Sequence, residues 1–306
     1  MTHTYVRWSG LRQLLAELWV FGLKQAWACV FGAALLVLIL VTQWWYPSGG
    51  LARYDFLFLA ALVLQALLLA TRLETIGEAR LIFAFHAIAT AMEVFKTSPE
   101  IRSWIYPDAS LFRIGNVPLF AGFMYSAVGS YIARAWKVLR LRFEHYPPPV
   151  ATYVLAGAIY ANFYTHHFVV DVRAGLFIAA ALMFRRTRVY FTLIRRERHM
   201  PLLAGLLLVS LFIWMAENLS TWARIWVYPD QLHQWRLVSP HKLGAWFLLM
   251  LISFVLVSWL HRRELVASRS GALAAIHNKS RPEGRSHTRI RASELHRIAR
   301  ALRRAQ

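Results

Sequence analysis

The stretch Leu243-Gly-Ala-Trp-Phe-Leu-Leu-Met-Leu-Ile-Ser-Phe-Val-Leu-Val-Ser-Trp-Leu-His261 contains no acidic residue, no lysine and no arginine. About 20 apolar residues are needed to cross a hydrocarbon core roughly 30 Å thick. This stretch is therefore long enough to form a transmembrane helix. Inside lipid the backbone polar groups find no water, so a helix that satisfies them internally is the expected structure.

The rest of the chain has a similar composition. Of its 306 residues, 58% are hydrophobic, and the mean hydropathy is +0.42. The apolar residues lie in long blocks and do not alternate with polar ones, as they would in a transmembrane barrel. We therefore predict an all-α, polytopic transmembrane helical bundle of about eight spans. The predicted spans cover residues 25–46, 54–72, 79–97, 117–136, 149–167, 169–185, 200–220 and 243–261.

Positive charge is distributed unevenly between the two sides of this bundle. The two terminal segments and the connections after spans two, four and six hold 27 of the 35 lysines and arginines. Loops rich in lysine and arginine stay in the cytoplasm during insertion. We therefore expect both termini to be cytoplasmic and the number of spans to be even.

The chain divides into three predicted parts. Residues 1–24 are expected to form an interfacial amphipathic segment, residues 25–262 the bundle, and residues 263–306 a basic, partly disordered cytoplasmic tail. Attraction to anionic lipid headgroups is the simplest account of the tail and of the net charge of +20. The tail lacks the aromatic residues that stack on RNA bases, so no nucleic-acid partner is expected.

Two stretches near the same face of the bundle resemble each other. Because they end the third and seventh predicted spans, they have the same orientation, which indicates a 4+4 duplication about an axis normal to the membrane. The alternative is chance, since Trp and Tyr are enriched at membrane interfaces. Six residue types recur in the same order: Glu93, Thr97, Trp104, Tyr106, Pro107 and Asp108, then Glu217, Thr221, Trp226, Tyr228, Pro229 and Asp230.

The two glutamates of this repeat are candidate functional residues. Each lies inside the outer end of its span, where a carboxylate costs about 2–3 kcal/mol unless it is paired, protonated or exposed to water. Glu93 and Glu217 are therefore predicted to act as catalytic acid/base groups. The alternative interpretation is a hydrogen bond from each glutamate to a polar side chain of a neighbouring helix.

A dense polar turn lies between the fifth and sixth spans. It contains Asn162, His166, His167 and Asp171. Three interpretations remain open: a divalent metal site at His166, His167 and Asp171, an acid/base or proton-relay site, or a structural turn in which Asp171 pairs with Arg173. The residues predicted to contact a substrate on this side are Asn162, Tyr125, Asn218, Tyr106 and Tyr228.

Several of these motifs together resemble a known family. They are Met92-Glu-Val-Phe-Lys-Thr97, Pro118-Leu-Phe-Ala-Gly-Phe-Met-Tyr125, Asn162-Phe-Tyr-Thr-His-His167 and Ala216-Glu-Asn218. In these residues the chain is similar to the YoaT-like family of bacterial integral membrane proteins, a domain of unknown function (DUF 817), over about residues 25–262. The resemblance implies a multi-pass protein of the bacterial inner membrane and implies no activity.

Three functions are compatible with these patterns. The first is an enzyme that acts on an amphipathic or isoprenoid lipid through the acidic and histidine residues of the outer half. The second is a proton-coupled carrier that uses the same residues as a relay, although the inner halves of the spans offer few ionisable groups. The third is a membrane scaffold without an active site. The first two predict that Glu93, Glu217 and the turn from His166 to Asp171 converge in one cavity.

Overall fold

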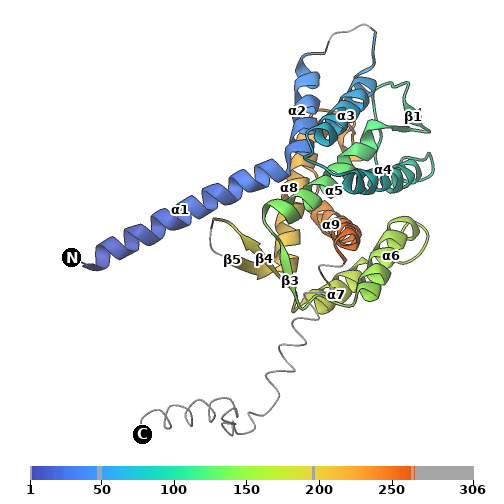
Figure 1. Ribbon diagram of the computed structural model, residues 1–306. Coiled ribbons are helices and arrows are strands. Elements are labelled where there is room, and N and C mark those ends of the chain that lie inside the picture. The colour runs from blue at the N-terminus through green and yellow to red at the C-terminus, as the bar shows by residue number, and fades with distance from the viewer. Residues whose placement is uncertain (1, 47–49, 195–196, 263–264, 266–306) are drawn as a thin grey trace, which may run out of the picture. The chain divides into compact units, whose positions relative to one another are not determined.

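The computed structural model describes residues 2–46, 50–194, 197–262 and 265. The predicted basic tail, residues 263–306, lies outside the described residues except for Leu265. The described part is mostly helical, and each of the eight predicted spans contains one helix (Figure 1). These helices are α2 (Val30–Trp44), α3 (Arg53–Ala70), α4 (Ile76–Lys96), α5 (Phe120–Val138), α6 (Pro149–Thr165), α7 (Arg173–Phe184), α8 (Leu202–Trp222) and α9 (His241–Leu260).

A further helix, α1 (Thr2–Ala28), precedes the bundle and differs from the predicted boundary at residue 25. α1 extends to Ala28, and the chain bends by 72° at Cys29 before α2 begins. Contacts with distant strands hold the end of α1 in place. Glu17 accepts a hydrogen bond from Arg198 Nη2 at 2.6 Å, and Lys24 Nζ donates to the carbonyl of Thr192 at 2.8 Å.

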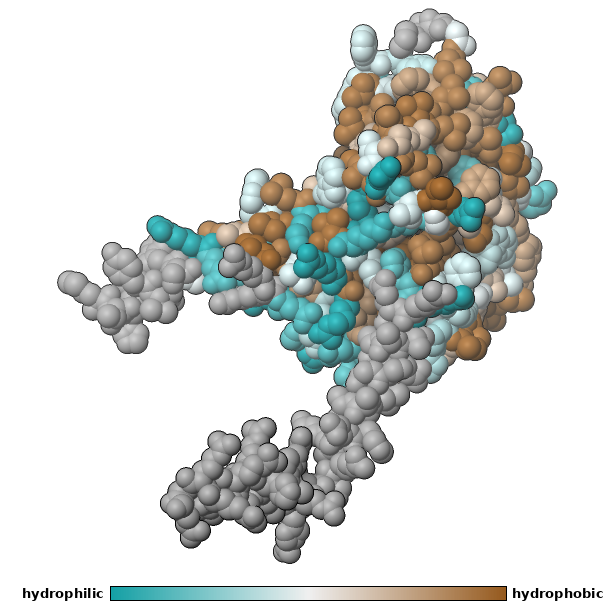
Figure 2. Space-filling model, viewed as in Figure 1, coloured by the Kyte–Doolittle hydropathy of each residue, from teal (hydrophilic) through white to brown (hydrophobic). Residues whose placement is uncertain are grey.

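Three of the helices are long and apolar enough to cross a membrane. They are α3, α8 and α9, and the bent pair of α1 and α2 makes up to four, judged by length and composition. Figure 2 shows apolar residues over much of the visible surface of the helical part. Leucines and valines such as Val63, Leu67 and Leu208 are more than half exposed. The chain therefore has helices that could span a membrane.

The helices contact one another in a regular pattern. α2 contacts α3 and α5, and α6 contacts α7 and α9. α4 packs on α5 as α8 packs on α9, and α5 and α9 contact each other. α2 also contacts α8, and α6 contacts α4. The largest buried apolar cluster lies between α4, α5, α6, α7, α8 and α9 and includes Phe85, Ile159 and Leu251.

The prediction of an all-α fold missed five short strands. β1 (Arg113–Ile114) and β2 (Val117–Pro118) form a small hairpin. β3 (Arg142–Glu144), β4 (Arg188–Thr192) and β5 (Glu197–Pro201) form an antiparallel sheet in that order, in which Val189 pairs with Phe143 and with Met200. β-Branched and aromatic residues favour a strand in β4, but β3, one of its two partners, is distant in sequence, so hydropathy alone does not indicate the sheet.

Candidate functional site

Glu93 lies on the last turn of α4 and is 1% exposed. Its Oε2 accepts hydrogen bonds from Trp104 Nε1 at 2.8 Å and from the Tyr106 hydroxyl at 2.7 Å. Its Oε1 accepts one from the Tyr125 hydroxyl of α5 at 2.6 Å. All three donors are neutral, so the carboxyl group is solvated by protein dipoles in place of water.

Glu217 has a corresponding environment near the end of α8, where it is 3% exposed. Its Oε1 accepts a hydrogen bond from the Tyr228 hydroxyl at 2.6 Å, and its Oε2 accepts one from Trp246 Nε1 of α9 at 2.7 Å. Tyr125 is the sixth residue of α5, and Trp246 is the sixth residue of α9. Each glutamate therefore receives donors from the loop that follows its own helix, two for Glu93 and one for Glu217, and one donor from the same position of the next helix.

The two loops of the repeat are joined directly. Ile105 and Val227 form an antiparallel bridge in which each backbone N–H donates to the other carbonyl at 3.0 Å. The rings of Trp104 and Tyr228 meet edge to face, with centroids 6.2 Å apart. The donors to Glu93 and to Glu217 are thus part of one aromatic cluster, so the structure brings the two glutamates' surroundings together.

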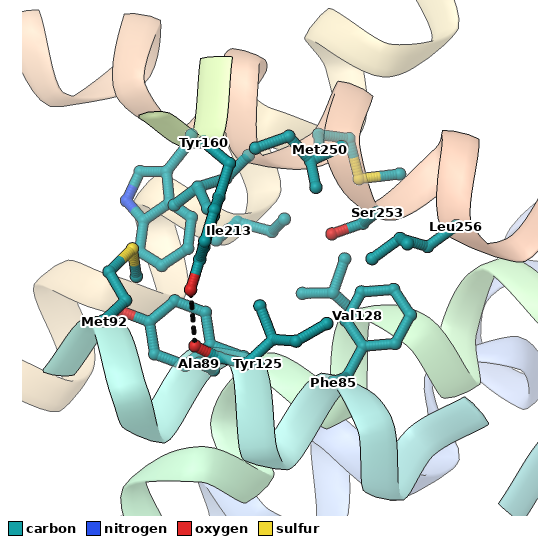
Figure 3. A pocket seen from close by; sticks show the side chains of 14 residues that line it. Phe85, Ala89, Met92, Tyr125, Val128, Tyr160, Ile213, Met250, Ser253 and Leu256 are labelled. Atoms are coloured by element: carbon teal, nitrogen blue, oxygen red, sulfur yellow. Dashed lines mark hydrogen bonds between the residues drawn. The ribbon is translucent and has the colours of Figure 1, made fainter. Parts of the chain in front are cut away.

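An apolar cavity lies on the other side of this cluster, between α4, α5, α6, α8 and α9 (Figure 3). The cavity is small, with about 40 Å³ of space for water-sized molecules, and it is partly open to the outside. Tyr125 and Trp246 both line it, with ring centroids 6.1 Å apart. The two residues that donate to the buried carboxyl groups therefore also form the cavity wall.

The predicted polar turn is present between α6 and α7. Asn162 is buried, and its Nδ2 donates to Asp171 Oδ1 at 3.2 Å, while Arg173 Nε donates to Asp171 Oδ2 at 2.6 Å. The Arg173 hydrogen bonds hold the pKa of the Asp171 carboxyl well below its usual range. Asp171 is thus occupied in a structural contact, which is one of the three interpretations that the sequence left open.

His166 and His167 face a lysine that the sequence did not single out. Lys96 Nζ lies 2.7 Å from His167 Nε2 and 3.5 Å from His166 Nε2, and Lys96 is 5% exposed. The Nδ1 of His166 lies 2.7 Å from the carbonyl of Asn162, which fits an Nδ1–H tautomer whose Nε2 accepts from the ammonium. In the described part of the chain, no three His, Cys, Asp or Glu side chains gather as a metal site would require.

Three of the predicted substrate contacts have other partners. The side chain of Asn218 bonds the backbone at Trp214 and Val238, at 2.8 and 2.9 Å. Tyr106 and Tyr228 are hydrogen-bonded to the glutamates. Of the residues predicted to bind substrate, Tyr125 lines the cavity.

The sequence analysis missed a second lysine, Lys242, and Trp246, and it assigned a different role to Trp104. Lys242, on the first turn of α9, places Nζ 4.3 Å from the ring centre of Tyr228 and 5.8 Å from that of Trp104. Trp246 lies outside the repeated motif, so only its position one helical turn after Lys242 could have indicated it. Trp104 was recognised in the repeat but was interpreted as an interfacial residue.

A second polar cluster lies at the opposite ends of α4 and α5, with its ionisable groups mostly just outside the predicted spans. Glu74 is 5% exposed and accepts hydrogen bonds from Ser130, from Gln65 Nε2 at 2.6 Å and from Arg134 Nη2 at 3.2 Å. Glu78 is 3% exposed and pairs with Lys137 Nζ at 2.7 Å. These carboxylates, unlike Glu93, are neutralised by cations.

These features define a class: a helical protein with apolar, membrane-length helices and two buried carboxyl groups beside an apolar cavity. Residues 17–254 match the family described as "Protein of unknown function (DUF817)", and the chain belongs to that family. It is similar to the "Uncharacterized protein YoaT" of Bacillus subtilis (strain 168), with 38% identity over 238 residues, which are 78% of this chain and 89% of that protein. No solved structure matches the chain.

Proposed function

We propose that the bundle crosses the bacterial inner membrane eight times and consists of two duplicated four-helix units, α2–α5 and α6–α9. Several helix contacts support this because they occur in corresponding pairs, such as α2 with α5 and α6 with α9. The positions of Tyr125 and Trp246 correspond in the same way. Arg102 and Arg224, each two residues before the repeated tryptophan, both have positive φ, 44° and 52°.

In this proposal both termini and the β3–β4–β5 sheet are cytoplasmic, and the loops with Ile105 and Val227 are external. The charge bias supports this orientation because β4, β5 and their flanks carry six arginines. Leu14, Leu15 and Leu18 of α1 are each at least half exposed, which suits an interfacial helix with its apolar residues in the lipid. The basic tail is proposed to contact anionic headgroups.

We propose that the protein is a membrane-embedded enzyme that acts on an amphipathic or isoprenoid lipid. The observation that carries the proposal is that Tyr125 and Trp246 line an apolar cavity and also donate hydrogen bonds to Glu93 and Glu217. The apolar wall suits contact with an apolar chain, while polar groups at its end fix the reacting part. Glu93 and Glu217 supply the acid/base groups, and the phenol of Tyr125 connects Glu93 to the cavity.

The test compares the lipids of cells that carry the wild-type protein with those that carry Glu217→Gln. This variant keeps the size of the side chain and removes its carboxyl chemistry. Glu144→Gln in β3, distant from the cavity, is the matched control. We expect one lipid species to accumulate or disappear in Glu217→Gln only. Identical lipid profiles at equal protein abundance would contradict the enzyme and favour the carrier or the scaffold.

A proton-coupled carrier remains the second candidate, because polar side chains continue along α4 between its two ends. His86 Nδ1 and Thr90 Oγ1 are buried without a hydrogen-bond partner, and both lie against Gly122 of α5. With Glu78 and Glu93 they form a polar line at helical spacing. A proton-coupled carrier would let protons enter proteoliposomes down an imposed pH gradient and so acidify their interior. His86→Phe would abolish this acidification.

A further inference from the structure

The helix faces that line the apolar cavity continue into two lysines. On α4, Lys96 lies four residues after Met92, and on α9, Lys242 lies four residues before Trp246, both of which line the cavity. Residues four apart lie on the same helix face, one turn apart, which is about 5.4 Å along the axis. The cavity therefore has ammonium groups beyond its wall, at the end of the bundle where α4 ends and α9 begins.

Neither lysine has a carboxylate in ion-pair contact. The ion pairs formed by the described residues include neither Lys96 nor Lys242. Lys96 is 5% exposed and faces two imidazole nitrogens, and Lys242 faces the rings of Tyr228 and Trp104. Glu217 and Asp230 act on Lys242 only from longer range. Burying a cation against neutral partners is costly, so the arrangement favours an additional negative charge.

A third cation lies beside them. Arg173 begins α7, and its charge acts on both Lys96 and Lys242. The charge of Lys242 also acts on Lys96, while Asp171 acts on Lys96 with the opposite sign. Asp171 neutralises Arg173 through an ion pair of 2.5 Å. His167, which is exposed, lies next to Lys96 and offers a ring nitrogen as a further polar contact. The cluster combines two unpaired ammonium groups with a reachable imidazole.

We propose that Lys96 and Lys242, assisted by His167, bind an anionic phosphate or carboxylate group. This inference rests on the proposed function and makes it narrower: the substrate is a lipid with an acidic head, whose apolar chain occupies the cavity beside Tyr125 and Trp246. A zwitterionic lipid places a cation near these lysines and is disfavoured. The same anion could come from a free phosphate, which fills the head site and leaves the apolar cavity empty.

The experiment uses the full chain in nonionic detergent and measures binding of phosphatidic acid, of phosphatidylcholine with the same acyl chains, and of inorganic phosphate. Lys242→Gln and Lys96→Gln remove one charge each, and Lys242→Arg keeps it. Arg236→Gln removes an exposed charge from the same end of the bundle and is the control. A ligand that binds only the folded state raises the unfolding midpoint, so each variant's folding is checked in the same measurement.

We expect wild-type protein to prefer phosphatidic acid to phosphatidylcholine. Each Lys→Gln substitution should lower the affinity for phosphatidic acid about tenfold, since a charge-assisted contact is lost. Lys242→Arg should stay within about twofold of wild type because it keeps the charge. Arg236→Gln should also stay within about twofold, because exposed charges contribute little. Equal losses in Arg236→Gln and Lys242→Gln, or no preference for the acidic lipid, would overturn the head-group site.

The phosphate measurement separates this inference from the enzyme. Lysine-dependent binding of inorganic phosphate with no binding of phosphatidic acid would confirm an anion site and contradict a lipid substrate. Binding of both lipids with equal affinity, unaffected by either lysine, would keep the lipid cavity and overturn the anion site. Lys242→Gln is the decisive variant if Lys96→Gln does not fold, because Lys242 is only half-buried.

Discussion

Buried glutamates occur at both ends of α4, and their partners differ. At one end, Glu74 and Glu78 face Arg134 and Lys137, which neutralise their charge. At the other end, Glu93 receives only neutral hydroxyl and indole donors. A carboxylate paired with a cation is fixed in its ionised form, whereas one held by neutral dipoles keeps a charge or a proton available for chemistry. The difference separates, on a single helix, glutamates that form ion pairs from one that does not, and the proposed function assigns chemistry to the second kind.

The same substitution at both ends tests this separation, and Glu74→Gln should have the largest effect. It leaves the Arg134 guanidinium, 4% exposed, without its carboxylate. Breaking a buried ion pair by removing one partner costs about 3–5 kcal/mol. We expect the unfolding free energy in a denaturant titration to fall by about that amount. An unchanged midpoint would mean that Glu74 does not stabilise the bundle.

Glu93→Gln should be nearly neutral for stability. The amide oxygen of the glutamine can still accept hydrogen bonds from Trp104 and Tyr106. Its NH₂ group can donate to the Tyr125 hydroxyl, which then accepts a hydrogen bond where it donates one in the wild type. We expect the unfolding free energy to change by less than about 1 kcal/mol, because no buried group loses its partner. The lipid phenotype should nevertheless match that of Glu217→Gln. A loss of stability as large as that of Glu74→Gln would remove the distinction between the ends.

The pH dependence of the polar turn should give the smallest effect. The pKa of Asp171 is below its usual value because Arg173 donates to it, so the stabilisation is complete above about pH 4, the unfolded value. It is lost as the pH falls toward the folded value. We expect the thermal midpoint to fall slightly more in acid for wild type than for Asp171→Asn, and side-chain exposure of 34% keeps the difference small. Parallel curves would show that the turn does not depend on this ion pair.

Two different patterns in the sequence predicted the helices and the similarity between the two glutamates. Apolar block length indicated α3, α8 and α9, and the spacing of Glu, Trp, Tyr and Pro indicated that Glu93 and Glu217 have equivalent surroundings. Lys96 could not be recognised, because its partners His166 and His167 lie on another helix pair. Trp246 depends in the same way on the rotation of α9 against α8. Such contacts are set by helix packing, which periodicity does not determine.

The bridge between Ile105 and Val227 joins the loop that follows Glu93 to the loop that follows Glu217. Each loop carries hydroxyl or indole donors for the glutamate of its own half, and two backbone hydrogen bonds of 3.0 Å hold the loops to each other. A movement of the first loop that withdraws Tyr106 from Glu93 therefore also pulls on the second loop, in which Tyr228 donates to Glu217. The two hydrogen-bonded loops are therefore expected to move together, so a change around one carboxyl group is expected to reach the surroundings of the other.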